Sequence, residues 1–154
     1  MAVMLRFTTL ILLAILSVDI ASARTGNIRV KALQTDPPVP NTQTCAGKPY
    51  TSGWAFYSTT IIVPYSDGVG CENVKNHLIV TIGDISSPRP QLQSCDVTPA
   101  GSPVICNWRC LSAYGGTGTE LDFAAPRSQA EHINQALAEE YAMVEGGFDC
   151  PKFT

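Results

Sequence analysis

The residues of this chain that could do acid–base chemistry are two histidines and several carboxylates. His132 and Glu120 are the pair to test first, because small secreted ribonucleases use a histidine and a glutamate across a sheet as general acid and base. His132 falls one turn inside an expected helix, beside its apolar stripe, which favours a packed or capping role. His77 has Asn76 and Leu78 as neighbours and no carboxylate close to it in sequence. The histidines therefore indicate no catalytic site.

Two other motifs look like chemical sites but have simpler explanations. Gly115–Gly118 is glycine-rich, but a phosphate cradle needs a helix directly after it, and here a strand pattern follows, which indicates a hairpin turn. Glu120 and Asp122 alternate with Leu121 and Phe123, as on a half-buried strand with one face in water. No serine stands in a Gly-x-Ser-x-Gly motif. We therefore expect a protein without enzymatic activity, cofactor or metal.

The six cysteines are the residues whose chemistry the sequence indicates most strongly. An even number of cysteines is typical of the disulfide framework of a secreted protein, and the secretion signal is described below. We therefore expect three disulfides. Zinc would need closely spaced cysteine and histidine ligands, and the histidines are far from Cys106 and Cys110. On an extended strand the Cα atoms of these two cysteines would be about 13 Å apart. That exceeds the roughly 7 Å limit of a bridge, so each must pair elsewhere. The expected disulfide residues are Cys45, Cys71, Cys95, Cys106, Cys110 and Cys150.

Residues 1–23 have the pattern of a secretory signal peptide. Arg6 precedes an apolar run over residues 7–16, and Ala21-Ser22-Ala23 provides the small residues that a signal peptidase accepts. A membrane-spanning helix needs roughly 20 apolar residues, and Asp19 follows too early for that. We therefore expect a secreted, extracellular protein with no membrane span.

Residues 24–44 form an expected flexible leader, and residues 45–154 an expected single disulfide-bonded domain. The leader has three prolines among polar residues and no apolar period, a composition that favours extended, unpacked chain. The remaining length suits one small domain. The net charge of −3 and the absence of a Lys/Arg cluster argue against binding of nucleic acid. We expect the protein to be a monomer.

The first half of the domain predicts a strand and a helix. Residues 54–63 are rich in aromatic and β-branched side chains and stop at a proline, which predicts a strand. Residues 84–103 contain four prolines and are expected to be mostly irregular. Between these segments, a helix over residues 71–83 is predicted by three apolar residues spaced four apart, Val74, Leu78 and Ile82.

The second half predicts two strands, a helix and a last edge strand. Residues 104–114 and 119–124 are the two strands, joined by the glycine turn. A helix over residues 128–144 begins at Ser128-Gln129-Ala130-Glu131, which has the capping-box pattern. Residues 148–153 are expected to add a short strand at the sheet edge, where Pro151 is tolerated. Cys106, Trp108 and Cys110 alternate along the first strand, so all three are expected on one face.

These elements follow the order β-α-β-β-α-β. That order is the split, ferredoxin-like α+β plan, an antiparallel sheet with two helices on one face. Trp54, with Tyr50 and Tyr57, is the candidate for an exposed aromatic contact with a partner. The alternative is that Trp54 caps the core at the start of its strand. Trp108 is expected to pack on a disulfide.

One stretch of the chain also resembles a known family. Its motifs are Cys106-x-Trp108-x-Cys110, Gly116-Thr117-Gly118, Glu120-Leu121, Ala124 and His132, with the ending Gly147-Phe148-Asp149-Cys150-Pro151. Together they resemble the virus-encoded killer toxin six of smut fungi and related secreted effectors of plant-pathogenic ascomycetes. The resemblance implies a small disulfide-bonded α/β sandwich that is secreted and has no enzymatic activity. The chain departs from the toxin subunits in its proline-rich leader, its fewer cysteines and its lack of an obvious membrane-inserting helix.

The leading hypothesis is a secreted, non-enzymatic effector or toxin-like protein of a fungus. It would act by binding a host or competitor protein or surface in an extracellular space, and the partner is unknown. Two alternatives stay open at this point. One is a small secreted hydrolase of the ribonuclease kind, and the other is a membrane-active antimicrobial protein.

Overall fold

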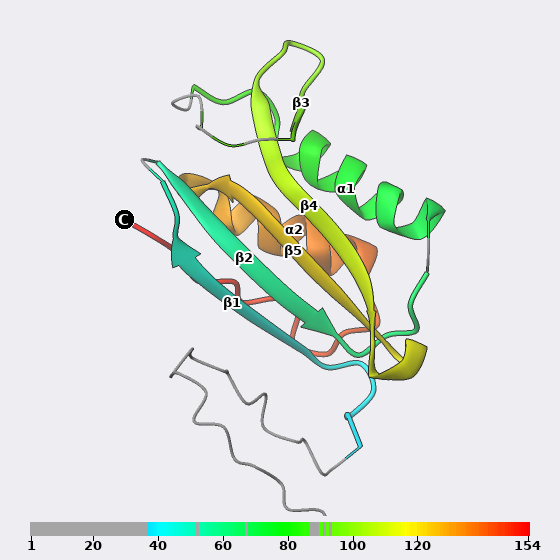
Figure 1. The fold of residues 1–154 in the computed structure, drawn as a ribbon. Helices are drawn as coiled ribbons and strands as arrows, with labels where there is room; N and C mark the ends of the chain where they lie inside the picture. The colour runs from blue at the N-terminus through cyan, green and yellow to red at the C-terminus, as the bar shows by residue number, and fades with distance from the viewer. Residues whose placement is uncertain (1–36, 52, 67, 87–89, 91, 93) are drawn as a thin grey trace, which may run out of the picture. The chain divides into compact units, whose positions relative to one another are not determined.

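A computed structural model describes residues 37–154 except 52, 67, 87–89, 91 and 93. The expected signal peptide and most of the expected leader lie outside the described residues. The described chain is an α+β fold with one five-stranded antiparallel sheet, two α-helices and three disulfides (Figure 1). The elements are β1 (Gln43–Pro49), β2 (Trp54–Ile61), α1 (Val69–Ile82), β3 (Cys95–Val97), β4 (Pro103–Ala113), β5 (Gly118–Pro126) and α2 (Ala130–Glu140).

The sheet has the strand order β1-β2-β5-β4-β3, and every neighbouring pair is antiparallel. β2 and β5 pair along their whole length at the centre of the sheet. Alternate residues of these strands, such as Tyr57 and Phe123, are fully buried in the main core with the apolar residues of both helices. Figure 1 shows both helices on this same side of the sheet. On the opposite side the described residues form no helix, and this side is called here the helix-free face.

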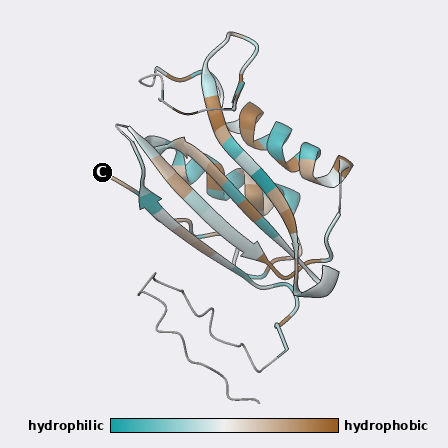
Figure 2. Cartoon of the chain, in the orientation of Figure 1, coloured by the Kyte–Doolittle hydropathy of each residue, from teal (hydrophilic) through white to brown (hydrophobic). Residues whose placement is uncertain are grey.

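The apolar periods predict both helices. α1 forms although its second half is rich in β-branched residues, because Val74, Leu78 and Ile82 are all buried against the sheet. Apolar and polar residues alternate along both helices (Figure 2). α2 does not begin with the predicted capping box, because Gln129 is its N-cap residue and no side chain caps it. Ser128 lies in a preceding 3₁₀ turn, where its hydroxyl accepts a hydrogen bond from Gln129.

A bulge in β4 changes which face its cysteines occupy. The pairing with β5 shifts between Cys106 and Arg109, where Asn107 adopts a positive φ of 54°. One extra residue reverses the alternation of side chains. Cys106 therefore lies with Ala124 on the helix-free face, whereas Trp108 belongs to the main core on the helix side. The prediction that Cys106 shares a face with Trp108 and Cys110 is wrong.

The edge of the sheet beside β2 is formed by β1, which begins before the expected start of the domain. The prediction of a strand over residues 148–153 is wrong, because these residues do not join the sheet. They pack instead against β1, where a Cβ at Gly47 would lie 2.8 Å from Pro151. β1 has no strand pattern in its sequence, since its residues are mostly small and polar.

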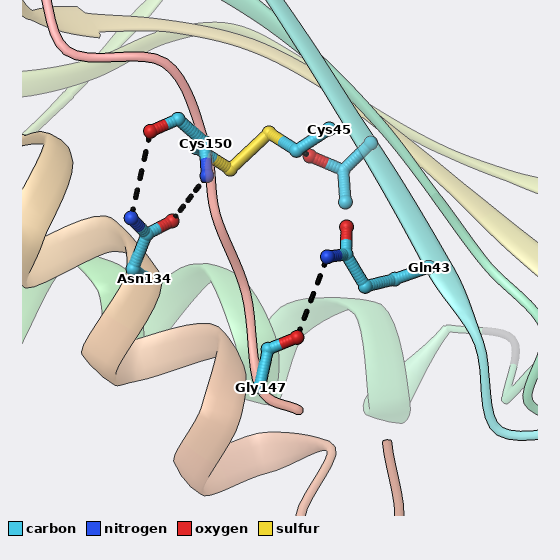
Figure 3. The surroundings of a disulfide bond; sticks show 6 residues. Gln43, Cys45, Asn134, Gly147 and Cys150 are labelled. Carbon is cyan, nitrogen blue, oxygen red and sulfur yellow. Dashed lines mark hydrogen bonds between the residues drawn. A yellow bond between two sulfur atoms is a disulfide. The ribbon is translucent and has the colours of Figure 1, made fainter. Parts of the chain in front are cut away.

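The last segment of the chain is fastened to both β1 and α2. The Cys45–Cys150 disulfide joins it to β1 with a Cα–Cα distance of 4.9 Å (Figure 3). Asn134 of α2 accepts a hydrogen bond from the Cys150 backbone N–H at 2.8 Å and donates one to its carbonyl at 3.5 Å. Gln43 donates to the Gly147 carbonyl at 3.4 Å. The C-terminus thus closes the sheet edge through side chains and a covalent bond.

The three expected disulfides are present and use all six cysteines. Cys106 and Cys110 pair with different partners, as the geometry of a strand required. Cys71 at the start of α1 is joined to Cys110 of β4, so this bond connects a helix to the sheet. The third bond, Cys95–Cys106, joins the short β3 to β4.

Candidate binding surface

A depression on the described surface lies where α1 begins, beside Trp108. It has a volume of about 600 Å³ and is open to solvent. We call it the Trp108 hollow, and its lining residues are Tyr65, Gly68, Val69, Cys71, Glu72, Trp108 and Cys110.

Three different elements position the walls of the Trp108 hollow. Trp108 is held by ring contact with Phe123 of β5, with centroids 5.8 Å apart. Tyr65 is fixed by a backbone hydrogen bond from its N–H to the Gly116 carbonyl. The Cys71–Cys110 disulfide ties the helix side of the hollow to the strand side. The Trp108 ring is therefore held from outside the hollow, and the disulfide links the helix side and the strand side of the hollow to each other.

The lining of the Trp108 hollow is mainly apolar. Val69 is 75% exposed at its rim, so its apolar side chain is available for contact with a partner. Glu72 is the charged residue of the lining, and its carboxylate lies 2.9 Å from Lys75 Nζ. That hydrogen bond, with help from Asp96, raises the pKa of Lys75 above its ordinary value although burial opposes it. Because Lys75 neutralises Glu72, the hollow presents an aromatic and aliphatic surface rather than a charged one.

The helix-free face of the sheet offers a second, smaller surface. Phe56 is half-buried there, with the ring of exposed Tyr50 at 6.2 Å and Lys48 Nζ at 5.7 Å from its centroid. Tyr50 is 46% exposed. Of the three aromatic residues expected to contact a partner, Tyr50 is thus the one that the structure places at the surface.

The prediction that Trp54 and Tyr57 are exposed contacts is wrong, because both side chains are fully buried, with an exposed fraction of 0%. Trp54 packs on the helix-free face in a small second core with Cys106 and Ala124, which agrees with the alternative that it caps a core. Tyr57 faces the helices, and burial raises its pKa to about 12. Its hydroxyl has no hydrogen-bond partner within the described part of the chain.

The structure does not bring together the pair that acid–base catalysis would need. Glu120 lies on the helix-free face, because it alternates with the buried core residue Leu121. His132 lies on α2, where its Nδ1 contacts Gln129 Oε1 at 2.6 Å. The capping or packing role that the sequence favoured for this histidine fits that contact.

His77 is the histidine with carboxylate partners, contrary to what its sequence neighbours indicated. Its Nδ1 lies 2.6 Å from Glu140 Oε1 and its Nε2 lies 2.7 Å from Glu139 Oε2. Both carboxylates belong to α2, more than sixty positions along the chain. Only the folded structure could reveal this pairing, because nothing near His77 in sequence signals it.

Metal-binding clusters and membrane-spanning helices are both absent from the described residues. No group of three or more histidine, cysteine, aspartate or glutamate residues there is arranged to hold a metal ion. In the same part of the chain, no helix is both long enough and apolar enough to cross a membrane.

Comparison with known proteins adds no assignment. No protein-family model, curated protein or solved structure matches this chain. What the chain can do must therefore be inferred from its own residues and geometry.

Proposed function

We propose that this protein is a secreted, non-enzymatic effector or toxin-like protein of the killer-toxin-six kind. It acts in an extracellular space by binding a host or competitor protein. The observation that carries the proposal is the Trp108 hollow, a mainly apolar depression whose two sides are linked by a disulfide and whose Trp108 ring packs on Phe123. Aromatic side chains in such depressions supply much of the energy at protein interfaces. An apolar side chain of the partner would fill the hollow against Trp108 and Val69.

Secretion is supported by the signal-peptide pattern of residues 1–23 and by the oxidised state of every cysteine. The resemblance of residues 106–132 to the toxin and effector family supports the biological class. Secretion and the biological class are therefore both parts of the proposal. A function by binding needs neither a catalytic pair nor a cofactor, and it uses the side chains that the fold holds most firmly.

We also infer that the fold is a variant of the split β-α-β-β-α-β plan. The chain passes from β2 through α1 and the short edge strand β3 to β4, and β5 lies between β2 and β4 in the sheet. α2 follows β5, as the plan requires. The variant differs at the edge next to β2, where the plan expects the last strand and the chain places β1.

The binding proposal is tested by a charge placed at the rim of the Trp108 hollow. Val69→Asp should leave the fold intact, because an aspartate is favourable in the first turn of a helix. Binding of the labelled mature protein to plant or fungal cell surfaces should weaken by at least about tenfold, since burial of a valine contributes roughly 1.5–3 kcal/mol.

The matched control is Val80→Asp. Val80 lies on the same helix and is 76% exposed, against 75% for Val69, but it is outside the hollow. Equal binding by wild type, Val69→Asp and Val80→Asp, with all three folded, would refute a role for the hollow. If RNA were cleaved and His132→Ala abolished the cleavage, the hydrolase alternative would replace the binding proposal. Leakage of dye from liposomes would favour the membrane-active alternative.

A further inference from the structure

The contact of His77 with two carboxylates joins the two helices of the protein. His77 lies at the middle of α1, and Glu139 and Glu140 end α2. Neighbouring residues of a helix point about 100° apart, yet both carboxylates reach the same imidazole at 2.7 and 2.6 Å. The ring therefore sits between the two side chains, with one ring nitrogen facing each.

This geometry specifies the protonation state of the imidazole. A neutral imidazole has one N–H donor and one acceptor nitrogen, whereas the charged ring has two donors. An acceptor nitrogen opposite an ionised carboxylate would bring two lone pairs together at hydrogen-bond distance. Both contacts are attractive when the ring is charged and both carboxylates are ionised. The hydrogen bond to Glu140 is the main cause that raises the pKa of His77, and the bond to Glu139 adds to it, while burial opposes both.

Within the described residues, the charges that act on the ring are those of Glu139 and Glu140. On α1 itself, Lys75 is engaged with Glu72 and with Asp96 of β3. On β4, Arg109 is paired with Asp122 of β5, which alternates with core residues and so lies on the helix-free face.

The remaining neighbours come from α2 and the turn after it. Gln135 donates to the second oxygen of Glu139 at 2.9 Å, and together with His77 it lowers the pKa of Glu139. Burial and the charge of Glu140 raise the pKa of Tyr141 to about 12, so this tyrosine stays neutral wherever a histidine titrates.

We propose that His77, Glu139 and Glu140 form a proton-operated clamp that ties the end of α2 to α1 when the imidazole is charged and loosens that end when it is neutral. The clamp is fully closed below the ordinary pKa of histidine, because the raised pKa of the folded state keeps the ring charged there. It opens as the pH rises through that raised pKa. At the acid end, the clamp weakens as the pH falls through the lowered pKa of Glu139, since a protonated carboxyl no longer accepts both hydrogen bonds.

The position of the clamp gives its opening a structural consequence. Glu140 also lines a depression of about 190 Å³ with Asn73 and Val74 of α1 and Met143 of the turn after α2. When the ring becomes neutral, Glu139 would separate from it before Glu140 does, because the side chain of Glu139 is more exposed, 48% against 28%. Release of the helix ends would widen this depression and loosen the turn before the C-terminal segment. In an extracellular protein with this clamp, the end of α2 is held more firmly to α1 in mildly acidic fluid than in neutral or alkaline fluid.

The test is an NMR titration of the His77 ring in the wild type and in the Glu139→Gln/Glu140→Gln variant. The wild-type ring should titrate at higher pH than the ring of the double variant. Amide hydrogen exchange at the end of α2, corrected for the intrinsic effect of pH, should speed up in the wild type above that pH. The variant His77→Gln should show no such pH-dependent step.

His132→Gln is the matched control, because His132 contacts a glutamine and lies away from the clamp. It should keep the step in hydrogen exchange. Titration of His77 at the same pH in the wild type and in the double variant would overturn the proposal. So would the same exchange step in His77→Gln as in the wild type.

Discussion

Removing the disulfides one at a time should destabilise the protein in the order of the loops they close. The bonds Cys45–Cys150, Cys71–Cys110 and Cys95–Cys106 span 105, 39 and 11 positions. In the chain-entropy model these loops correspond to about 5, 4 and 3 kcal/mol of stabilisation at 25 °C. The first value is comparable to the whole unfolding free energy of a marginal domain, which lies at roughly 5–15 kcal/mol.

The comparison between the longest and shortest loops is well controlled. One cysteine of each bond, Cys150 and Cys106, is fully buried, so the two double Cys→Ala variants lose similar packing. The difference of about 2 kcal/mol should therefore come from the unfolded chain. With a urea dependence of roughly 1–3 kcal/mol per molar, the unfolding midpoint of Cys45→Ala/Cys150→Ala should lie about 1 M below that of Cys95→Ala/Cys106→Ala.

The assay is urea unfolding followed by tryptophan fluorescence, with two-state behaviour checked by circular dichroism. The same midpoint for both variants, or a lower one for Cys95→Ala/Cys106→Ala, would refute the loop-length reasoning. It would indicate instead that the small core around Trp54, next to the shorter bond, contributes more than the closure of the chain ends.

Two further substitutions test how the C-terminal segment is held. Gly47→Val should lower the unfolding free energy by about 1–3 kcal/mol through overpacking, because even a Cβ there would lie 2.8 Å from a proline of that segment. Ala46→Val, on the exposed side of the same strand, should change it little, and equal effects in urea unfolding would contradict the packing described. Asn134→Ala should cost about 1–2 kcal/mol through its two lost hydrogen bonds to the Cys150 backbone. Gln135→Ala, which removes an exposed pair, should cost under about 0.5 kcal/mol, and a larger loss than for Asn134→Ala would contradict this assignment.

The elements that the sequence predicts well are those with a strong apolar period. The stripe of Val74, Leu78 and Ile82 predicts α1, and the alternation of Leu121 and Phe123 predicts β5, because each pattern reflects a single buried face. β1 has no such pattern. It is positioned by pairing with β2 and by the Cys45–Cys150 bond, which are long-range effects.

The wrong predictions for individual residues also arise from effects that no local sequence pattern shows. A bulge at Asn107 moves Cys106 to the other face, and strict alternation cannot foresee one inserted residue. Trp54 is predicted as a surface contact because aromatic side chains supply much of the energy at binding surfaces, but it is buried in the small core on the helix-free face. The Trp108 hollow and the partners of His77 both depend on elements far apart in sequence. Sequence patterns therefore predict the faces of elements here better than the sites formed between them.

The most direct test of the account is photo-crosslinking from the rim of the Trp108 hollow. The mature protein would carry a photoreactive phenylalanine analogue at position 69 in one sample and at position 80 in another. Both would be exposed to extracellular fluid from plant tissue and from competing fungal cultures. The account predicts a discrete protein adduct from position 69 that unlabelled wild-type protein competes away, and no such adduct from position 80. Adducts of the same pattern from both positions, or none from position 69 in either fluid, would contradict it.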